Sequence, residues 1–259
     1  MCDLWKNTTP QTVPIGAIPA QIDFALQQLP AARHIKLYNS GNFFDLRAIP
    51  TEDWPAIAER ARRFDTVIVE NHPNLCGPSC AAFQQLSGTQ LEVAMGLETS
   101  HPATLAMLNK QMTTDDFARA CDTLRKNSIL IRAFVLLKPP GTSEEQGIER
   151  AIESVRFAFD CGVGCCAVIP VRKGNGIMEQ LHARGEFSSP RLSSLELVVR
   201  ETLSWSRGRV FADLWDAEQF ADSAEFADEQ IRTLTAMNRT QRPSDRMPVT
   251  FTPLPMSRL

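Results

Sequence analysis

Short apolar runs alternate with helical patterns between about residue 35 and residue 215, and this alternation restricts the possible folds more than any other feature. The run Thr66–Glu70 is rich in β-branched residues, which is typical of a strand covered on both faces. Before it, apolar side chains between residues 54 and 64 recur at the spacing of one helix face. Strands that alternate with helices at this spacing form βαβ units around a mainly parallel sheet. We therefore expect an α/β fold, arranged as a partial barrel or as a doubly wound sheet.

The same patterns predict the individual elements and their ends. Strands are expected at 35–39, 66–70, 91–99, 130–137, 165–171 and 210–215. Helices are expected at 54–64, 74–86, 114–124, 148–159, 195–203 and 217–238. Thr51 and Thr114 are candidate N-caps, and Ser143 with Gln146 has the spacing of a capping box. We expect a barrel domain over residues 1–216, and a C-terminal helix with an extended tail over residues 217–259.

Composition excludes several classes of protein. The 259 residues can bury a full core, and the net charge of −3 gives no bulk attraction for nucleic acid. The sequence has no apolar run of about 18 residues and no basic leader before an apolar stretch. We therefore expect a cytoplasmic protein with no membrane partner. The seven cysteines, an odd number, argue against a disulfide framework.

Polar side chains stand where the predicted strands end. In parallel α/β folds, ligands bind at these carboxyl ends. The residues there include Asn39–Gly41, Glu70, Glu98, Lys138 and Pro170–Arg172. A carboxylate at such a rim is costly unless it meets a cation or hydrogen-bond donors. Each glutamate therefore has either a ligand-binding role or a structural role as an ion pair or cap.

Several of these segments, taken in order, resemble one known family. They are Ile35–Asp45, then Gly96–Thr99 with Leu108–Lys110, and then Leu136–Pro140. The combination is similar to radical S-adenosylmethionine (SAM) enzymes of the subgroup that includes the archaeosine-synthase radical SAM subunit and, more distantly, the elongator catalytic subunit. The similarity covers roughly residues 2 to 215. It implies a partial (β/α)6 TIM-like barrel of parallel strands that lacks its first strand.

The first residues add to this resemblance. Met1–Trp5 is similar to the end of the family motif Cys-x-x-x-Cys-x-x-Cys, so Cys2 would be the third ligand of a [4Fe–4S] cluster. The first two ligands would then lie upstream of residue 1, and the chain as written is expected to be inactive. In this family the cluster cleaves SAM reductively to a 5′-deoxyadenosyl radical, which abstracts hydrogen from a substrate. The resemblance also implies a reductant such as a flavodoxin or ferredoxin, and raises tRNA as a substrate.

The resemblance assigns SAM contacts residue by residue. Asn39, Ser40 and Gly41 match the loop that receives the SAM amino group, although this loop lacks the glutamate that other radical SAM families often carry there. Glu98 matches the position near the ribose, and Glu70 is a second polar contact. The strands beside the adenine are marked by Val135 and by Pro170 with Val171. No catalytic residue is assigned.

The remaining cysteines are not expected to bind the cluster. Cys76 and Cys80 have the spacing of two cluster ligands, but the third position is Phe83, so the match fails. Cys165 and Cys166 lie in an apolar strand, where free cysteine behaves as a small hydrophobe.

His72 is expected to make a loop hydrogen bond. Arg172 and Lys173 either bind a substrate anion or form a solvated rim.

Two other functions remain open. The first is a non-catalytic relative that binds SAM or a nucleotide without a cluster. The second is a cofactor-free barrel lyase or isomerase that uses Glu70 and Glu98 as acid and base.

Overall fold

A computed structural model describes residue 9, residues 11–174 and residues 176–245. Six strands follow one another in the sheet in chain order. They are β1 (His34–Leu37), β2 (Thr66–Glu70), β3 (Gln90–Glu98), β4 (Leu130–Leu137), β5 (Cys165–Pro170) and β6 (Arg209–Ala212). β1 pairs in parallel with β2, β2 with β3, and β5 with β6. A doubly wound sheet reverses its strand order, and this one does not. The expected α/β class and partial TIM-like barrel are confirmed.

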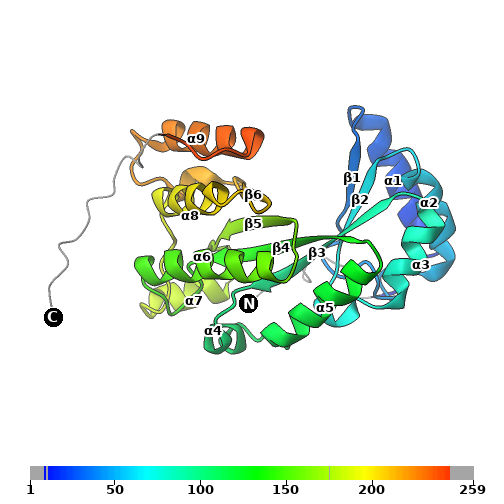
Figure 1. Ribbon diagram of the computed structural model, residues 1–259, viewed down its shortest axis with the longest axis horizontal. Coiled ribbons are helices and arrows are strands. Elements are labelled where there is room, and N and C mark those ends of the chain that lie inside the picture. Colours follow the sequence, from blue (N-terminus) through cyan, green and yellow to red (C-terminus); the bar gives the residue numbers. More distant parts are fainter. Residues whose placement is uncertain (1–8, 10, 175, 246–259) are drawn as a thin grey trace, which may run out of the picture. The chain divides into compact units, whose positions relative to one another are not determined.

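Helices connect the strands (Figure 1). The α-helices are α1 (Ala17–Gln28), α2 (Trp54–Ala61), α3 (Pro78–Ser87), α4 (Pro102–Met107), α5 (Thr114–Lys126), α6 (Glu144–Asp160), α7 (Ile177–Ala183), α8 (Leu192–Ser204) and α9 (Ala227–Thr240). Short 3-10 helices are η2 (Thr51–Asp53), η3 (Pro73–Leu75) and η4 (Ala217–Phe220). In the described residues, no helix combines the length and apolar character that a membrane crossing needs.

The described residues divide into two compact units. Unit 1 draws on Met1–Leu97, Leu105–Ala133 and Asp160–Gly164, and unit 2 draws on Glu98–Thr104, Phe134–Phe159 and Cys165–Leu259. Each unit has its own buried core. The domain boundary predicted at residue 216 stays a prediction.

An aromatic cluster forms part of the core of unit 1. Phe43 lies 4.9 Å from Phe83, and Phe44 lies 5.7 Å from Trp54, measured between ring centroids and with the rings edge to face. These geometries match the preferred packing of aromatic pairs. The aromatic cluster joins Phe43 and Phe44 to α2 and α3. It therefore fixes the position of the loop between β1 and Phe43.

Several local predictions needed correction. Thr51 does not cap α2, because its hydroxyl donates to the Glu52 carboxylate instead. The N-cap of α5 is Thr113, one residue earlier than expected, and it forms a capping box with Asp116. The box of Ser143 and Gln146 at the start of α6 is confirmed by both of its hydrogen bonds.

The helix expected at 217–238 is interrupted. Its residues form η4 and α9 instead, separated by a segment that contains Asp222. The Asp222 carboxylate accepts hydrogen bonds from Ser193 N (2.9 Å), Ser193 Oγ (2.7 Å) and Gln230 Nε2 (2.6 Å). These bonds hold the segment against the start of α8, and a continuous helix could not satisfy them in the same way.

A buried ion pair lies inside unit 1. Arg132 Nε donates to Glu92 Oε1 at 2.6 Å, and the two side chains are only 9% and 3% exposed. Replacing Arg132 by methionine is expected to lower the free energy of unfolding by about 3–5 kcal/mol, because Glu92 then keeps a buried charge without this cation. Urea denaturation measures the loss. The double variant Glu92→Leu, Arg132→Met is expected to recover most of it.

The matched control is the exposed pair of Arg33 and Asp65, whose side chains are 82% and 53% exposed. Arg33→Met is expected to cost less than about 1 kcal/mol, because water already solvates both charges. Equal losses in Arg33→Met and Arg132→Met would contradict this account of the buried pair.

Candidate functional site

The loop that follows β1 is tied to the segment after β2 by hydrogen bonds that two asparagine side chains accept. Asn42 Oδ1 accepts from His72 N at 2.7 Å, and Asn71 Oδ1 accepts from Phe44 N at 3.3 Å. Phe43 N donates to Glu70 O at 2.8 Å. We call the two asparagine bonds the Asn42–Asn71 clasp. The clasp holds the loop across two carboxyl ends of the sheet, the edge at which parallel α/β folds bind ligands.

A cavity of about 750 Å³ lies beside this loop, entirely within unit 1. One part of its wall is apolar and comes from α1, with Ile18, Ile22 and Leu26 among its residues. The loop residues 38–43 form another part of the wall, and they supply amide and hydroxyl groups in addition to those of Thr9, Gln11, Thr12 and Gln21. Cavities of about 300–1,000 Å³ with mainly apolar walls and a few polar groups are typical small-molecule sites.

Asn39 lines this cavity, and its side chain has an unused acceptor. Its Oδ1 is buried and has no hydrogen-bond partner among the described residues, while its Nδ2 donates to Asn42 O at 3.4 Å. A buried carbonyl oxygen without a donor costs about 1–3 kcal/mol. A ligand that donates a hydrogen bond here would remove this cost.

Backbone strain lies next to Asn39. Ser40 adopts a left-handed conformation with φ of 55°. This region costs a residue other than glycine about 1–2 kcal/mol, and such outliers cluster at ligand-binding sites. Asn39, Ser40 and Gly41, which were predicted from sequence to act together, all line the one cavity.

Glu70 ends β2 and is half-buried. Burial raises the pKa of its carboxyl, and the charges of Lys110 and Lys36 oppose this rise without cancelling it. A carboxylate whose pKa is raised by desolvation at a strand end is a functional-site candidate. Its assigned contact to SAM stays a prediction.

His72 is a structural residue, as expected. Its Nδ1 accepts from Asn74 N at 3.2 Å, so its Nε2 carries the proton and donates to Lys110 O at 3.1 Å. Cys165 and Cys166 are fully buried, which confirms their role as small apolar side chains. Within residues 9, 11–174 and 176–245, no three His, Cys, Asp or Glu side chains form a metal-binding group. Cys2, the predicted cluster ligand, lies outside the described residues.

The other predicted contacts belong to unit 2. Glu98 ends β3 in a left-handed conformation with φ of 64°. Val135 is fully buried within β4. Pro170 is buried at the end of β5, and Val171 N donates to Leu137 O at 3.2 Å. Their roles beside the ribose and the adenine stay predictions.

Arg172 is neither a solvated rim residue nor an unpaired cation. Its Nη2 donates to Asp213 Oδ2 at 2.9 Å and to Trp215 O at 3.0 Å. The ion pair joins the segments after β5 and β6 and neutralises the guanidinium. An anion-binding role for Arg172 would have to compete with Asp213.

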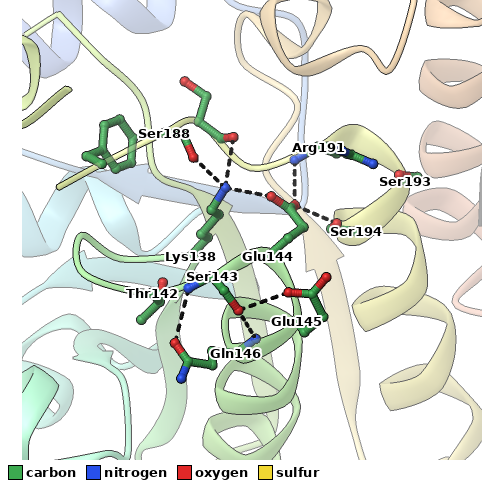
Figure 2. A network of polar contacts seen from close by, with 12 residues as sticks. Lys138, Thr142, Ser143, Glu144, Glu145, Gln146, Ser188, Arg191, Ser193 and Ser194 are labelled. Carbon is green, nitrogen blue, oxygen red and sulfur yellow. Dashed lines mark hydrogen bonds and ion pairs between the residues drawn. The ribbon is translucent and has the colours of Figure 1, made fainter. Parts of the chain in front are cut away.

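Sequence analysis placed Lys138 at the end of a strand but did not predict that it is a buried and paired cation. Lys138 is 6% exposed, and its Nζ donates to Glu144 Oε2 at 2.6 Å and to Ser188 Oγ at 2.8 Å (Figure 2). Glu144 Oε1 in turn accepts from Arg191 N at 2.8 Å and from Ser194 Oγ at 2.6 Å. The network anchors the segment before α8 to the start of α6. Only the position of Lys138 directly after an apolar strand signalled this role.

Known proteins resemble this chain in sequence and in fold. Archaeosine synthase subunit beta of Methanosarcina acetivorans is 29% identical over 177 residues, which are 64% of this chain and 50% of that protein. The protein of the same name from Thermococcus kodakarensis is 26% identical over 189 residues, or 69% of this chain and 57% of that one. Elp3 of Methanocaldococcus infernus superposes with a TM-score of 0.60 at 15% identity, over 86% of this chain and 58% of that chain. No family model matches the chain.

These similarities support the resemblance to the radical SAM superfamily that the strand-end motifs predicted. In sequence, the chain is similar to archaeosine synthase subunit beta. It spans about half the length of the curated relatives that it matches. The similarity to Elp3 shows the fold, and the activity of a whole relative does not pass to this chain by similarity alone.

Replacing Glu70 by glutamine is expected to stabilise the protein at neutral pH. Because the folded pKa of Glu70 lies above its usual value of about 4.5, stability falls as the pH rises from that value through the folded pKa. Glutamine has no charge to bury, so the gain appears above this range and disappears below it. Urea midpoints at pH 4 and pH 8 measure the difference.

The exposed Glu59 on α2 provides the control, because Glu59→Gln is expected to change neither midpoint. A Glu70→Gln variant that loses stability at pH 8 would show that the carboxylate makes a stabilising contact.

Proposed function

We propose that this chain is the SAM-binding part of a radical SAM-type iron–sulfur enzyme, and that SAM occupies the cavity beside the loop after β1. The observation that carries the proposal concerns Asn39, which lines a cavity of about 750 Å³ and whose buried Oδ1 has no hydrogen-bond partner in the described part of the chain. SAM carries an α-ammonium group, which donates charge-assisted hydrogen bonds. Such bonds are about twice as strong as those between neutral groups.

The described residues fit SAM in three respects. Asn39 offers an acceptor to the ammonium group, and Ser40 with Gly41 lines the same wall. The apolar side chains of α1 line another part of the cavity and offer contact to apolar parts of a ligand. The clasp from Asn42 and Asn71 fixes the loop before a ligand arrives, which reduces the ordering cost of binding.

Cys2 is the one residue that the proposal assigns to the [4Fe–4S] cluster. Thiolates suit iron–sulfur clusters, and when cluster and SAM are bound together they supply the one-electron chemistry of the family. Cys2 would hold one iron, and one thiolate does not retain a cluster by itself. A reductant protein, tRNA as substrate and a cytoplasmic location remain parts of this proposal that follow from the family resemblance.

One observation favours the alternative of an acid–base barrel enzyme without cofactors. The raised pKa of Glu70 would suit a general acid. Its proposed partner, Glu98, belongs to the other unit. Turnover of a substrate in the absence of both iron and SAM would support it over the radical SAM proposal.

Replacing Asn39 by leucine is expected to weaken SAM binding roughly 10- to 150-fold, because the change removes an acceptor for a charged donor while keeping the side-chain volume. Saturation-transfer NMR or calorimetric titration with SAM measures this without any cluster. Asn74→Leu is the matched control, because Asn74 lies in unit 1 and does not line the cavity. SAM binding of equal strength to the wild type and to Asn39→Leu would reject Asn39 as the ammonium acceptor.

A further inference from the structure

An exposed tyrosine ring stands next to Asn39 in the wall of the cavity. Tyr38 directly follows β1, is 39% exposed and lines the same cavity as Asn39. Among the described residues that line the cavity, Phe43 is the other aromatic residue, and it is fully buried and packed edge to face on Phe83. Tyr38 is therefore the aromatic residue of this wall that keeps exposed surface for a ligand.

The Tyr38 ring has a cation over its face. Lys36 precedes Tyr38 by two residues, and side chains two residues apart along a strand lie on the same face. Lys36 Nζ lies 5.8 Å from the centroid of the Tyr38 ring. Aromatic rings attract cations within about 6 Å of the centroid, because the faces of the ring carry partial negative charge. The contact with Lys36 shows that a cation has access to this ring.

The cavity wall offers a cationic ligand few other partners. Among its described residues, Asp45 is the one carboxylate. Asp45 Oδ1 accepts from Arg47 N at 3.0 Å and from Arg47 Nε at 3.3 Å, and Asp45 Oδ2 accepts from Arg47 Nη2 at 3.3 Å. A cation bound in the cavity would have to compete with Arg47 for this carboxylate. The face of an aromatic ring is then the remaining electron-rich surface.

We propose that the Tyr38 ring holds the sulfonium group of SAM by a cation–π contact and makes the cavity selective for SAM over uncharged thioethers. The inference rests on the proposed SAM site and adds to it a residue that determines specificity. A sulfonium group carries a positive charge and has no hydrogen to donate, so a hydrogen-bond acceptor such as Asn39 does not recognise it. An aromatic face recognises such a cation without a hydrogen bond.

The adjacency of Tyr38 and Asn39 fits the structure of SAM. Consecutive Cα atoms are about 3.8 Å apart, and both residues line the one cavity. In SAM, a short carbon chain joins the sulfonium sulfur to the ammonium group that we assign to Asn39. One bound molecule can therefore place its ammonium group at Asn39 and its sulfonium group at Tyr38.

Lys36 and the sulfonium group would compete for the ring. Both are cations, so they repel each other when they share one ring. Glu70 offers Lys36 another partner, because the charge of Lys36 acts on the Glu70 carboxyl and opposes the rise of its pKa. We therefore expect Lys36 to reduce the preference of the wild type for SAM.

Calorimetric titration with SAM and with S-adenosylhomocysteine tests the proposal. The two compounds differ in the methyl group and the charge on sulfur, so the ratio of their affinities cancels the contacts that both make. Tyr38→Leu is expected to lower the preference for SAM about 2- to 30-fold, the range of cation–π contacts from exposed to desolvated sites. Tyr38→Phe keeps an aromatic face and is expected to retain the preference. An unchanged ratio in Tyr38→Leu would overturn the proposal.

Two further variants test the specificity of this effect. Leu29 lines the same cavity and is 61% exposed, so Leu29→Ala is expected to keep the affinity ratio of the wild type. A loss of preference as large as that in Tyr38→Leu would overturn the assignment to Tyr38. Lys36→Met is expected to raise the preference for SAM by up to about 5-fold, because it removes a partly exposed competing charge. A ratio that falls would contradict the competition for the ring.

A contact in the wild type provides a test that needs no variant. Tyr38 is the only tyrosine of the chain, so protonated tyrosine in an otherwise deuterated protein labels this ring alone. We expect a nuclear Overhauser effect between its ring protons and the S-methyl protons of bound SAM. Saturable SAM binding without this effect would reject Tyr38 and leave the SAM site standing. A wild type that binds neither compound would reject the SAM site and, with it, the role of Tyr38.

Discussion

The hydrogen bonds of Asn42 and Asn71 hold the loop after β1 against the loop after β2, and the proposed chemistry of unit 1 depends on them. Both amides act between segments about 30 residues apart in the chain. They form because parallel strands bring their carboxyl ends to one edge of the sheet. Phe43 and Phe44 then pack against side chains of α3 and α2, so core packing holds the loop as well as the hydrogen bonds.

Features that cost stability gather in this loop and beside it. Asn39 leaves a buried oxygen without a donor, Ser40 is left-handed, and Glu70 is a carboxyl whose charge is disfavoured by burial. Folded proteins usually avoid each of these and accept them at functional sites. Away from the site, the cost of a buried charge is offset by hydrogen bonds within the protein. Lys138 is as buried as a core residue, but carboxylate and hydroxyl acceptors surround its ammonium group.

The sequence predicted the elements that carry a strong local pattern. β2, β3 and β4 appear within about one residue of their expected ends, since runs such as Thr66–Glu70 leave little choice. Helix α1 was missed, because its apolar side chains face a cavity and not a closed core, and its pattern is therefore weak. The sequence predicted Thr114 as the N-cap of α5, but the N-cap is Thr113. Thr113 stands three residues before Asp116, and the two residues form a capping box.

The site residues likewise divide into those with a local sequence pattern and those brought together by the fold. Asn39, Ser40 and Gly41, which the family resemblance assigned to SAM, line one cavity because they are consecutive residues after one strand. Their contact with SAM stays a prediction. The pairing of Asn42 with His72, and of Asn71 with Phe44, could not be predicted, because it depends on how two loops meet. The contact of Cys76 with Met95 joins η3 to β3 and likewise has no sequence signature.

The central claim is that Asn39 receives the ammonium group of SAM, and NMR of the asparagine side chains tests it most directly. With ¹⁵N-labelled asparagine, the Asn39 side-chain amide resonance should shift in a saturable way as SAM is added. Methylthioadenosine, which has the same nucleoside but no amino acid group, should leave this resonance in place. An equal shift with both compounds, or no shift with SAM, would contradict the account.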